Sequence, residues 1–315
     1  MTTKTIMVVV DLRNPSQAAI ERAAGLAHAL SADLELFVCH YDPDIAAGQF
    51  STVWIANSGR EGLMAILEGR LDELASALRQ RGLNVTTDLI WDHPLDEAIV
   101  RKVVASQPWM VIKEVHHHNA LKRTILTSTD WSLIQRCPVP LMLAKLDTST
   151  ALRKICAAID PTHEHDKPAE LDDRIFRITK TIADATGAAL HAVHTYAVKT
   201  EPVGLEAPPI GKLTELIRQT HERVFQSFLE THPVAANNAH LLPGLAHERL
   251  VDFAMQESID ILVMGAISRR GLGRIFIGST AERILDRLPC DLLIVSPAHI
   301  DWSSLQASSS DRELS

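Results

Sequence analysis

Residues 262–295, LVMGAISRRGLGRIFIGSTAERILDRLPCDLLIV, contain the pattern that decides the fold of this chain. A short apolar run predicts a buried strand, and Gly265 ends that strand with a residue that lacks a Cβ atom. The tripeptide Gly278, Ser279 and Thr280 then precedes an amphipathic run that predicts a helix, and a second apolar strand closes the segment. This order of strand, loop, helix and strand is typical of a parallel α/β unit.

The loop and the helix start of this segment predict a site for an anion. The first backbone N–H groups of a helix have no partner within the helix, and the hydroxyls of Ser279 and Thr280 would add further donors. The loop carries three cations, Arg269, Arg270 and Arg274. Guanidinium groups beside a helix N-terminus suit phosphate, so we expect a ligand that carries phosphate groups.

The spacing of the small residues resembles a motif of the universal stress protein family, whose ATP-binding members carry G-x2-G-x9-G-[ST] at this place. Here the segment has Gly265-x2-Ser268-x9-Gly278-Ser279, so a serine stands at the second glycine position. Ser268 can donate a hydroxyl to phosphate, but its Cβ disfavours positive φ and blocks the closest approach of the backbone. The resemblance implies ATP as the ligand, with Mg²⁺ as its candidate companion.

An internal repeat makes the resemblance more specific, because a shift of 151 residues lays the first half of the chain on the second. The superposed pairs are Ser128 and Ser279, Thr129 and Thr280, Arg136 and Arg287, Pro138 and Pro289, and Glu97 and Glu248. With a slightly different offset the opening runs 6–11 and 155–160 coincide, and each ends in aspartate. The whole pattern resembles a tandem universal stress protein.

Each copy reads as five strands that alternate with four helices, which predicts an α/β fold with two tandem doubly wound parallel sheets. The expected strands are 6–11, 34–40, 85–91, 110–113 and 141–144 in the first copy, and 155–160, 190–196, 240–242, 261–264 and 292–295 in the second. The resemblance implies that the sheets are of the universal stress protein, or adenine nucleotide alpha hydrolase-like, type.

The predicted domains are residues 1–146 and 153–298, joined by a polar segment, and residues 299–315 are predicted to be disordered. Members of the resembled family pair through their last strands. The same pairing here would bury 141–143 against 292–294 and pack the two copies as a pseudo-dimer.

The resemblance also implies roles for residues of the second copy. Asp160 stands where ATP-binding members use an aspartate near the adenine and ribose, and Thr195 stands where they use backbone groups for the adenine edge. The phosphate set would be Gly265, Ser268, Arg269, Arg270, Gly278, Ser279 and Thr280. Two structural roles remain open, because Asp160 also suits a turn before a proline and Ser279 also suits a helix cap.

The first copy lacks the small residues of the motif. Glu114, His117 and Thr127 stand at the positions of its three small residues, and the carboxylate of Glu114 would repel a phosphate. We therefore expect that the first copy does not hold ATP.

Composition excludes several classes of protein. The net charge of −8 and the lack of a basic stripe with interleaved aromatics argue against a nucleic-acid partner. The N-terminal residues enter a short strand directly, with neither a signal-peptide core nor a membrane span, so we expect a cytoplasmic protein with no membrane partner.

Histidine clusters at 116–118 and at His163 and His165 lack cysteine and lack the spacing of a zinc site, so we expect no metal. His247 and Glu248 are adjacent, but adjacency alone gives no catalytic geometry, and no G-x4-G-K-[ST] motif occurs. We expect no catalytic residues and no dedicated enzyme, with slow hydrolysis of ATP left open.

Two functional classes remain. One is a stress-response module that binds ATP or a related phosphate ligand in its second domain. The other is a nucleotide-independent scaffold that interacts with proteins or with an apolar ligand. The sequence names no protein client, and a further homodimer of the whole chain stays open.

Overall fold

The structure is a computed structural model, and it describes residues 3–12, 18–46, 53–118, 123–145, 151–162, 170–197, 210–266, 283–285 and 287–297. The elements of the first half are β1 (Thr5–Val9), α1 (Ala18–Leu30), β2 (Asp33–His40), α2 (Pro43–Ala46), α3 (Val53–Gln80), β3 (Val85–Trp91), α4 (Leu95–Ser106), β4 (Met110–His118), β5 (Arg123–Ile125), α5 (Ser128–Arg136) and β6 (Leu141–Lys145). Those of the second half are β7 (Lys154–Ala158), α6 (Glu170–Thr186), β8 (Ala189–Tyr196), α7 (Ile210–Thr231), the 3-10 turn η1 (Ala236–Asn238), β9 (Ala239–Pro243), α8 (Ala246–Gln256), β10 (Ile261–Gly265) and β11 (Asp291–Val295).

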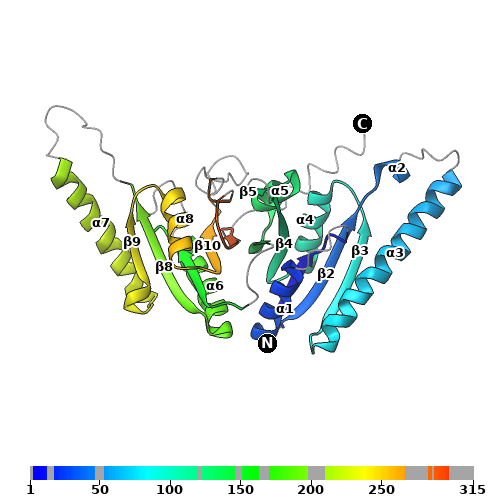
Figure 1. The fold of residues 1–315 in the computed structure, drawn as a ribbon, viewed down its shortest axis with the longest axis horizontal. Coiled ribbons are helices and arrows are strands. Elements are labelled where there is room, and N and C mark those ends of the chain that lie inside the picture. The colour runs from blue at the N-terminus through cyan, green and yellow to red at the C-terminus, as the bar shows by residue number, and fades with distance from the viewer. Residues whose placement is uncertain are drawn as a thin grey trace.

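All the described strands belong to one sheet, in the order β3-β2-β1-β4-β6-β11-β10-β7-β8-β9, with β5 paired to β4. The first five strands of this order and the last five are each parallel among themselves. Figure 1 shows the two halves side by side, with α3 and α7 on the outer flanks. The predicted α/β fold with two doubly wound halves is confirmed.

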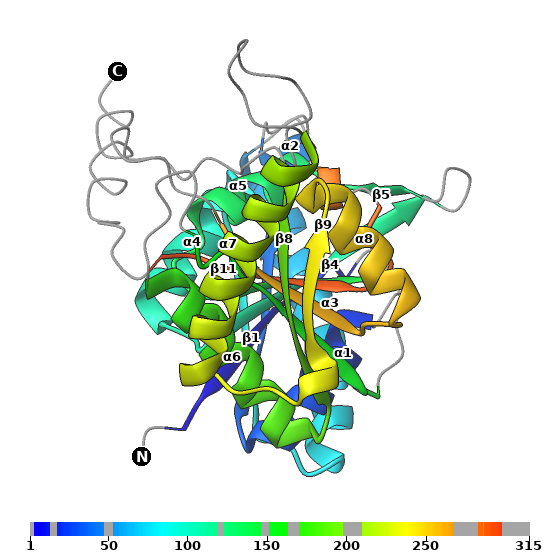
Figure 2. The same cartoon turned by 90° about the vertical axis from the view of Figure 1, so that its left-hand side faces the viewer.

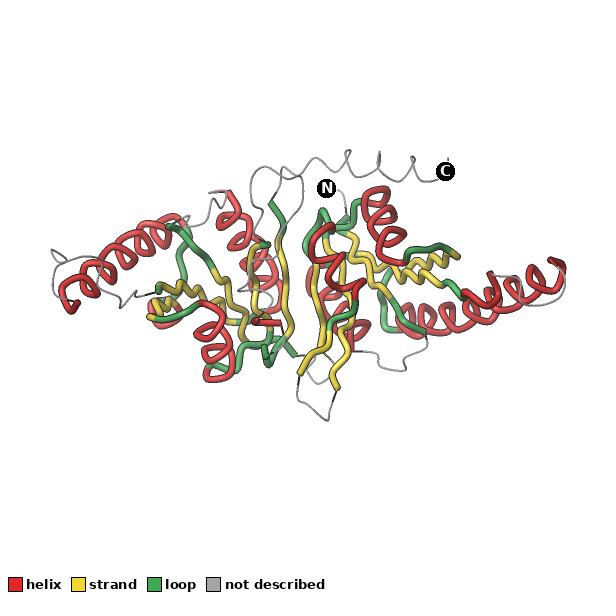
Figure 3. The backbone as a smooth tube through the Cα atoms, turned by 90° about the horizontal axis from the view of Figure 1, so that it is seen from above, coloured by secondary structure: helices red, strands yellow, loops and turns green. Residues whose placement is uncertain are grey.

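The halves join through their last strands. β6 and β11 pair antiparallel, with Leu143 opposite Leu292 and Leu141 opposite Ile294. The predicted pseudo-dimer pairing is therefore confirmed, and it turns two half-sheets into a single continuous sheet. Seen from above in Figure 3, strands of both halves lie side by side at the centre, and long helices extend outward on both sides. Each half thereby removes an exposed sheet edge from the other.

Helices cover both faces of the sheet. α1, α3, α6 and α7 contribute to the core on one face, and α4, α5 and α8 contribute to the core on the other. Figure 2, turned by 90°, shows this layering around the strands. Because both faces are buried, the central strands are nearly continuous apolar runs such as LMLAK in β6 and DLLIV in β11. The outermost strand β3 carries polar residues instead.

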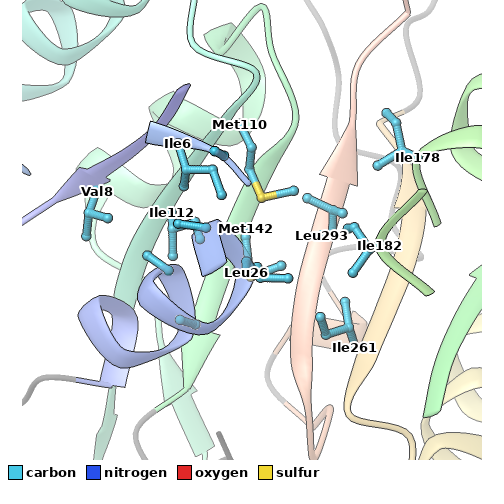
Figure 4. Close-up of a cluster of buried hydrophobic side chains, with 14 of the residues drawn as sticks. Ile6, Val8, Leu26, Met110, Ile112, Met142, Ile178, Ile182, Ile261 and Leu293 are labelled. Carbon is cyan, nitrogen blue, oxygen red and sulfur yellow. The ribbon is translucent and has the colours of Figure 1, made fainter. Parts of the chain in front are cut away.

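One core crosses the seam without interruption. Leu26, Met110 and Met142 of the first half face Leu293 and Ile182 of the second half in Figure 4, and all five side chains are buried. Full burial of a side chain such as leucine contributes about 1.5–3 kcal/mol. The halves are therefore held together by a shared apolar core as well as by strand pairing.

Several element bounds differ from the prediction. β4 continues to His118 and pairs with β5 as a hairpin, where a strand over 110–113 was predicted and the polar residues beyond it gave no strand signal. Residues 283–285 of the last predicted helix are helical, but its start lies outside the described residues. The predicted domain boundaries and the tail 299–315 likewise fall largely outside them and stay predictions.

Candidate functional site

Three predicted site residues of the second half lie together at the carboxyl ends of neighbouring strands. β7 lies between β10 and β8, so the strand order reverses there, which is where ligands bind in doubly wound sheets. Asp160 follows β7, Thr195 lies at the end of β8, and Gly265 is the last residue of β10. All three residues are half-buried. This edge is the upper side of the sheet in Figure 1.

Asp160 takes part in a local hydrogen-bond network. The hydroxyl of Thr162 donates to Oδ1 of Asp160 at 2.6 Å, and the backbone N–H of Asp160 donates to Oδ1 of the buried Asp172 at 3.0 Å. The bond from Thr162 is typical of a turn, which was the structural alternative for Asp160. The carboxylate and hydroxyl together also form a donor and acceptor pair suited to the hydroxyls of a sugar.

A buried histidine pair lies behind Asp160. Nε2 of His194 lies 2.8 Å from Nδ1 of His221, and Nδ1 of His194 lies 3.2 Å from the carbonyl oxygen of Ile159. A carbonyl only accepts, so His194 donates from Nδ1, and its Nε2 accepts the Nδ1 proton of His221. Burial lowers the pKa of His194, partly offset by Asp160. His194 is therefore uncharged near neutral pH. Sequence reasoning did not identify this pair.

A second histidine pair lies on the opposite face of β8. Nδ1 of His191 is 3.1 Å from Nε2 of His240, and the two rings stack with centroids 5.3 Å apart. Burial lowers the pKa of both histidines, and their mutual repulsion lowers that of His191 further. The alternation of a strand explains the two faces, since residues 191 and 194 are three apart.

Gly265 has a packing role of its own. A Cβ atom at this position would lie 2.7 Å from Cδ2 of Leu171 and 3.2 Å from Cδ1 of Ile175, both on α6. Leu171 and Ile175 are buried, so neither can move away freely. Close contact between α6 and β10 therefore favours glycine here even without a ligand.

The rest of the predicted phosphate set lies outside the described residues. These are Ser268, Arg269, Arg270, Gly278, Ser279 and Thr280. The structure thus places Asp160, Thr195 and Gly265 together, and the contribution of the loop and helix start remains a prediction.

The corresponding edge of the first half contains a cavity of about 180 Å³. Its lining residues come from the carboxyl ends of β1 and β2, from the middle of β4 and from α1, α3, α4 and α5, and most of them are apolar. Glu114 lines it, as does Asp11, which follows β1. The residue that was predicted to disfavour phosphate, Glu114, is therefore one of the lining residues.

The helix start beside this cavity is closed by a capping box. The backbone N–H and the hydroxyl of Thr127 donate to Oδ2 of Asp130 at 2.7 and 2.8 Å, and the backbone N–H of Asp130 donates to the Thr127 hydroxyl at 3.2 Å. Nζ of Lys113 lies 2.6 Å from Oδ1 of Asp130. The T-x-x-D spacing was the available sequence signal for the cap, and nothing local pointed to Lys113.

Comparison with known families gives the same division into two copies. The universal stress protein family model matches residues 2–145 and again residues 151–296. The chain belongs to the universal stress protein family. It carries two tandem copies of the family's domain, as the internal repeat predicted.

Similar proteins cover nearly the whole chain. It is 25% identical over 297 residues to universal stress protein E of Escherichia coli (strain K12), which covers 93% of this chain and 94% of the relative. A functionally unknown protein from Pseudomonas aeruginosa PAO1 has a TM-score of 0.76 at 25% identity, with 98% of each chain covered. A universal stress protein from Archaeoglobus fulgidus DSM 4304 has a TM-score of 0.69 at 14% identity, over 94% of this chain and 99% of the other, and supports the fold alone.

Three further observations on this universal stress protein concern metal ions, thiols and membranes. Among the described residues no group of three or more histidine, cysteine or acidic side chains could hold a metal ion. His163 and His165 lie outside those residues. Burial raises the pKa of Cys137 to about 12, so this thiol is unreactive. None of the described helices is both long enough and apolar enough to cross a membrane.

Proposed function

We propose that this chain is a stress-response binding protein whose second half holds ATP or a related phosphate ligand. The supporting observation is the convergence of Asp160, Thr195 and Gly265 where the strand order reverses, directly before the segment that carries the family's phosphate motif. In this proposal the loop and the helix start of the second half bind the phosphates.

Each described residue fits one part of a nucleotide. The carboxylate of Asp160, next to the hydroxyl of Thr162, would accept hydrogen bonds from ribose hydroxyls. Thr195 would present backbone groups to the edge of the base. Gly265 lets β10 end in close contact with α6, directly before the segment that would bind the phosphates.

The phosphate part of the proposal rests on residues of the sequence. Gly278, Ser279 and Thr280 would bind phosphate oxygens with backbone N–H groups and hydroxyls, joined by the hydroxyl of Ser268. Arg269 and Arg270 would neutralise the phosphate charge, and Mg²⁺ would bridge phosphate oxygens when it is present. These groups bind and orient a nucleotide, and we assign none of them to catalysis.

A second candidate function is a nucleotide-independent scaffold that binds proteins or an apolar ligand. The observation that favours it is the mainly apolar cavity of the first half. The shared core at the seam would give such a scaffold a fixed arrangement of its two halves. The two functions can coexist, because they use opposite halves of the chain.

Thermal unfolding with and without Mg-ATP tests the nucleotide proposal. A ligand that binds only the folded state stabilises it, by about 2.7 kcal/mol when its concentration is a hundred times its Kd. We expect stabilisation of the wild-type chain and its loss in Gly278→Val, which places a branched side chain at the phosphate position. Thr127→Val, at the matching position of the first half, is the control and should keep the stabilisation. Equal stabilisation of wild type and Gly278→Val would contradict the proposed site.

A further inference from the structure

The start of α5 already holds an anion that belongs to the chain. Asp130 is fully buried, and its Oδ2 accepts hydrogen bonds from the backbone N–H and the hydroxyl of Thr127. A carboxylate in the first turn of a helix is stabilised by the helix dipole, as a bound phosphate would be. The electrostatic role of a ligand phosphate is therefore filled internally.

The ammonium group of Lys113, beside this helix start, is also already paired. Nζ of Lys113 lies 2.6 Å from Oδ1 of Asp130 and donates to the backbone oxygen of Glu114 at 3.2 Å. The Lys113 side chain is 14% exposed, and it is the only lysine or arginine among the described residues that line the cavity. A ligand phosphate would have to compete with Asp130 for this ammonium group.

The second half has neither member of this pair. The shift of 151 residues places Met264 at the position of Lys113 and Ala281 at the position of Asp130. Both charges are replaced together, which fits the penalty for leaving one member of a buried ion pair alone. The buried carboxylate of Asp130 is thus a feature of the first half, which also lacks the glycines of the motif.

The cavity itself favours an uncharged occupant. Its volume is about 180 Å³, and most of its lining residues are apolar, such as Val8, Ala19, Leu67 and Ile99. An engineered apolar cavity of about 150 Å³ holds one benzene molecule. Asp11, which follows β1, and Glu114 of β4 also line the cavity, and acidic residues disfavour a phosphate nearby.

We infer that the cavity of the first half binds a small, uncharged, mainly apolar molecule of about one ring in size, and that the Lys113–Asp130 pair excludes phosphate ligands from it. The inference deepens the second candidate function and rests on the proposed difference between the halves. It does not require that the second half binds ATP. The threonine hydroxyls at the start of α5 would serve one polar group of the ligand.

A matched pair of probes tests the inference on the full-length chain, with binding followed by fluorine NMR. 4-Fluorophenol is a neutral ring with one hydroxyl, and 4-fluorophenyl phosphate is the same ring with a phosphate group. We expect saturable binding of 4-fluorophenol, and at least a tenfold loss of affinity in Ala19→Leu, which fills the cavity. Ile66→Ala is the control, because Ile66 is 57% exposed on α3 beside the lining residue Leu67.

The aryl phosphate separates phosphate binding in the second half from ligand binding in the cavity of the first half. Its binding in the wild type should be unchanged by Ala19→Leu, because any site for it lies in the second half. In Asp130→Asn, Lys113 loses its partner, and we expect the aryl phosphate to gain a site that Ala19→Leu removes. If Asp130→Asn unfolds, the double variant Lys113→Met with Asp130→Ala takes its place. It carries the residues of the second half at both positions and leaves no unpaired charge, and it should still bind 4-fluorophenol.

Two results would overturn the inference. One is the absence of saturable 4-fluorophenol binding, or binding that Ala19→Leu leaves unchanged. The other is wild-type binding of the aryl phosphate that is as tight as that of the phenol and is lost in Ala19→Leu. Loss of ATP binding in the second half would leave both results unaffected, so failure of the nucleotide proposal is seen separately.

Discussion

Arg22 of α1 and Asp291 at the start of β11 form an ion pair across the seam, with Nε and Oδ2 2.6 Å apart. Their side chains are 3% and 0% exposed. Oδ1 of Asp291 also accepts a hydrogen bond from the backbone N–H of Lys145 at 2.9 Å. This carboxylate of β11 therefore contacts both α1 and β6 of the first half. A buried pair of this kind fixes how the two halves meet, because each charge depends on a partner in the other half.

Removal of one member of this pair should destabilise the whole chain. Arg22→Ala leaves Asp291 buried without its guanidinium partner, and we expect a loss of about 3–5 kcal/mol in the free energy of unfolding, measured by urea titration. Arg81→Ala is the control, because it breaks the largely exposed Arg81–Glu21 pair and should cost about 1 kcal/mol or less. Equal losses in the two variants would contradict a special role for the seam pair.

Gly265 and Gly25 should respond oppositely to the same substitution. At Gly265 the added methyl group would meet Leu171 at 2.7 Å, and we expect Gly265→Ala to lower the free energy of unfolding by about 1–3 kcal/mol. Gly25 lies exposed within α1 with nothing near its missing Cβ, and Gly25→Ala should raise stability by about 0.5–1 kcal/mol. A neutral Gly265→Ala would show that α6 does not pack this closely.

Acid should destabilise the second half through its buried histidines. Burial lowers the pKa of His191, His194 and His240, so the unfolded chain binds more protons than the folded one. The free energy of unfolding should therefore fall as the pH drops below about 6.5, the ordinary histidine value. His194→Gln removes one of these groups and should flatten the dependence between about pH 7 and pH 5, measured by urea unfolding. An unchanged slope would contradict the buried, neutral state of His194.

The helix cap of α5 should contribute to stability on its own. Thr127→Ala removes a side chain that both donates to Asp130 and accepts from its backbone. We expect a loss of about 1 kcal/mol in thermal or chemical unfolding. Thr127→Ser keeps the hydroxyl and should retain most of the stability, so similar losses in both variants would exclude the capping bond as the cause.

The fold was largely predictable from the sequence because its signals are local. The apolar runs at 34–40, 85–91 and 292–295 match β2, β3 and β11 to within a residue. The internal repeat then predicted the tandem arrangement, and the resemblance to the family predicted the pairing of the last strands. The hairpin of β4 and β5 was missed, since its polar residues show no apolar alternation.

The sites were less predictable because they depend on contacts between distant residues. The pairs Arg22–Asp291 and Lys113–Asp130 join segments that no local period relates. The sequence predicted that Gly265 ends a strand, but only the structure shows that α6 packs against it. The His194–His221 pair was hidden for the same reason, since one partner comes from β8 and the other from α7.

Calorimetric titration of Mg-ATP into the full-length chain tests the central claim most directly, because its stoichiometry counts the sites. We expect one site per chain that Gly278→Val abolishes and Thr127→Val leaves intact. Two sites per chain would contradict the proposed difference between the halves. No heat and no thermal stabilisation at millimolar ATP would contradict nucleotide binding altogether.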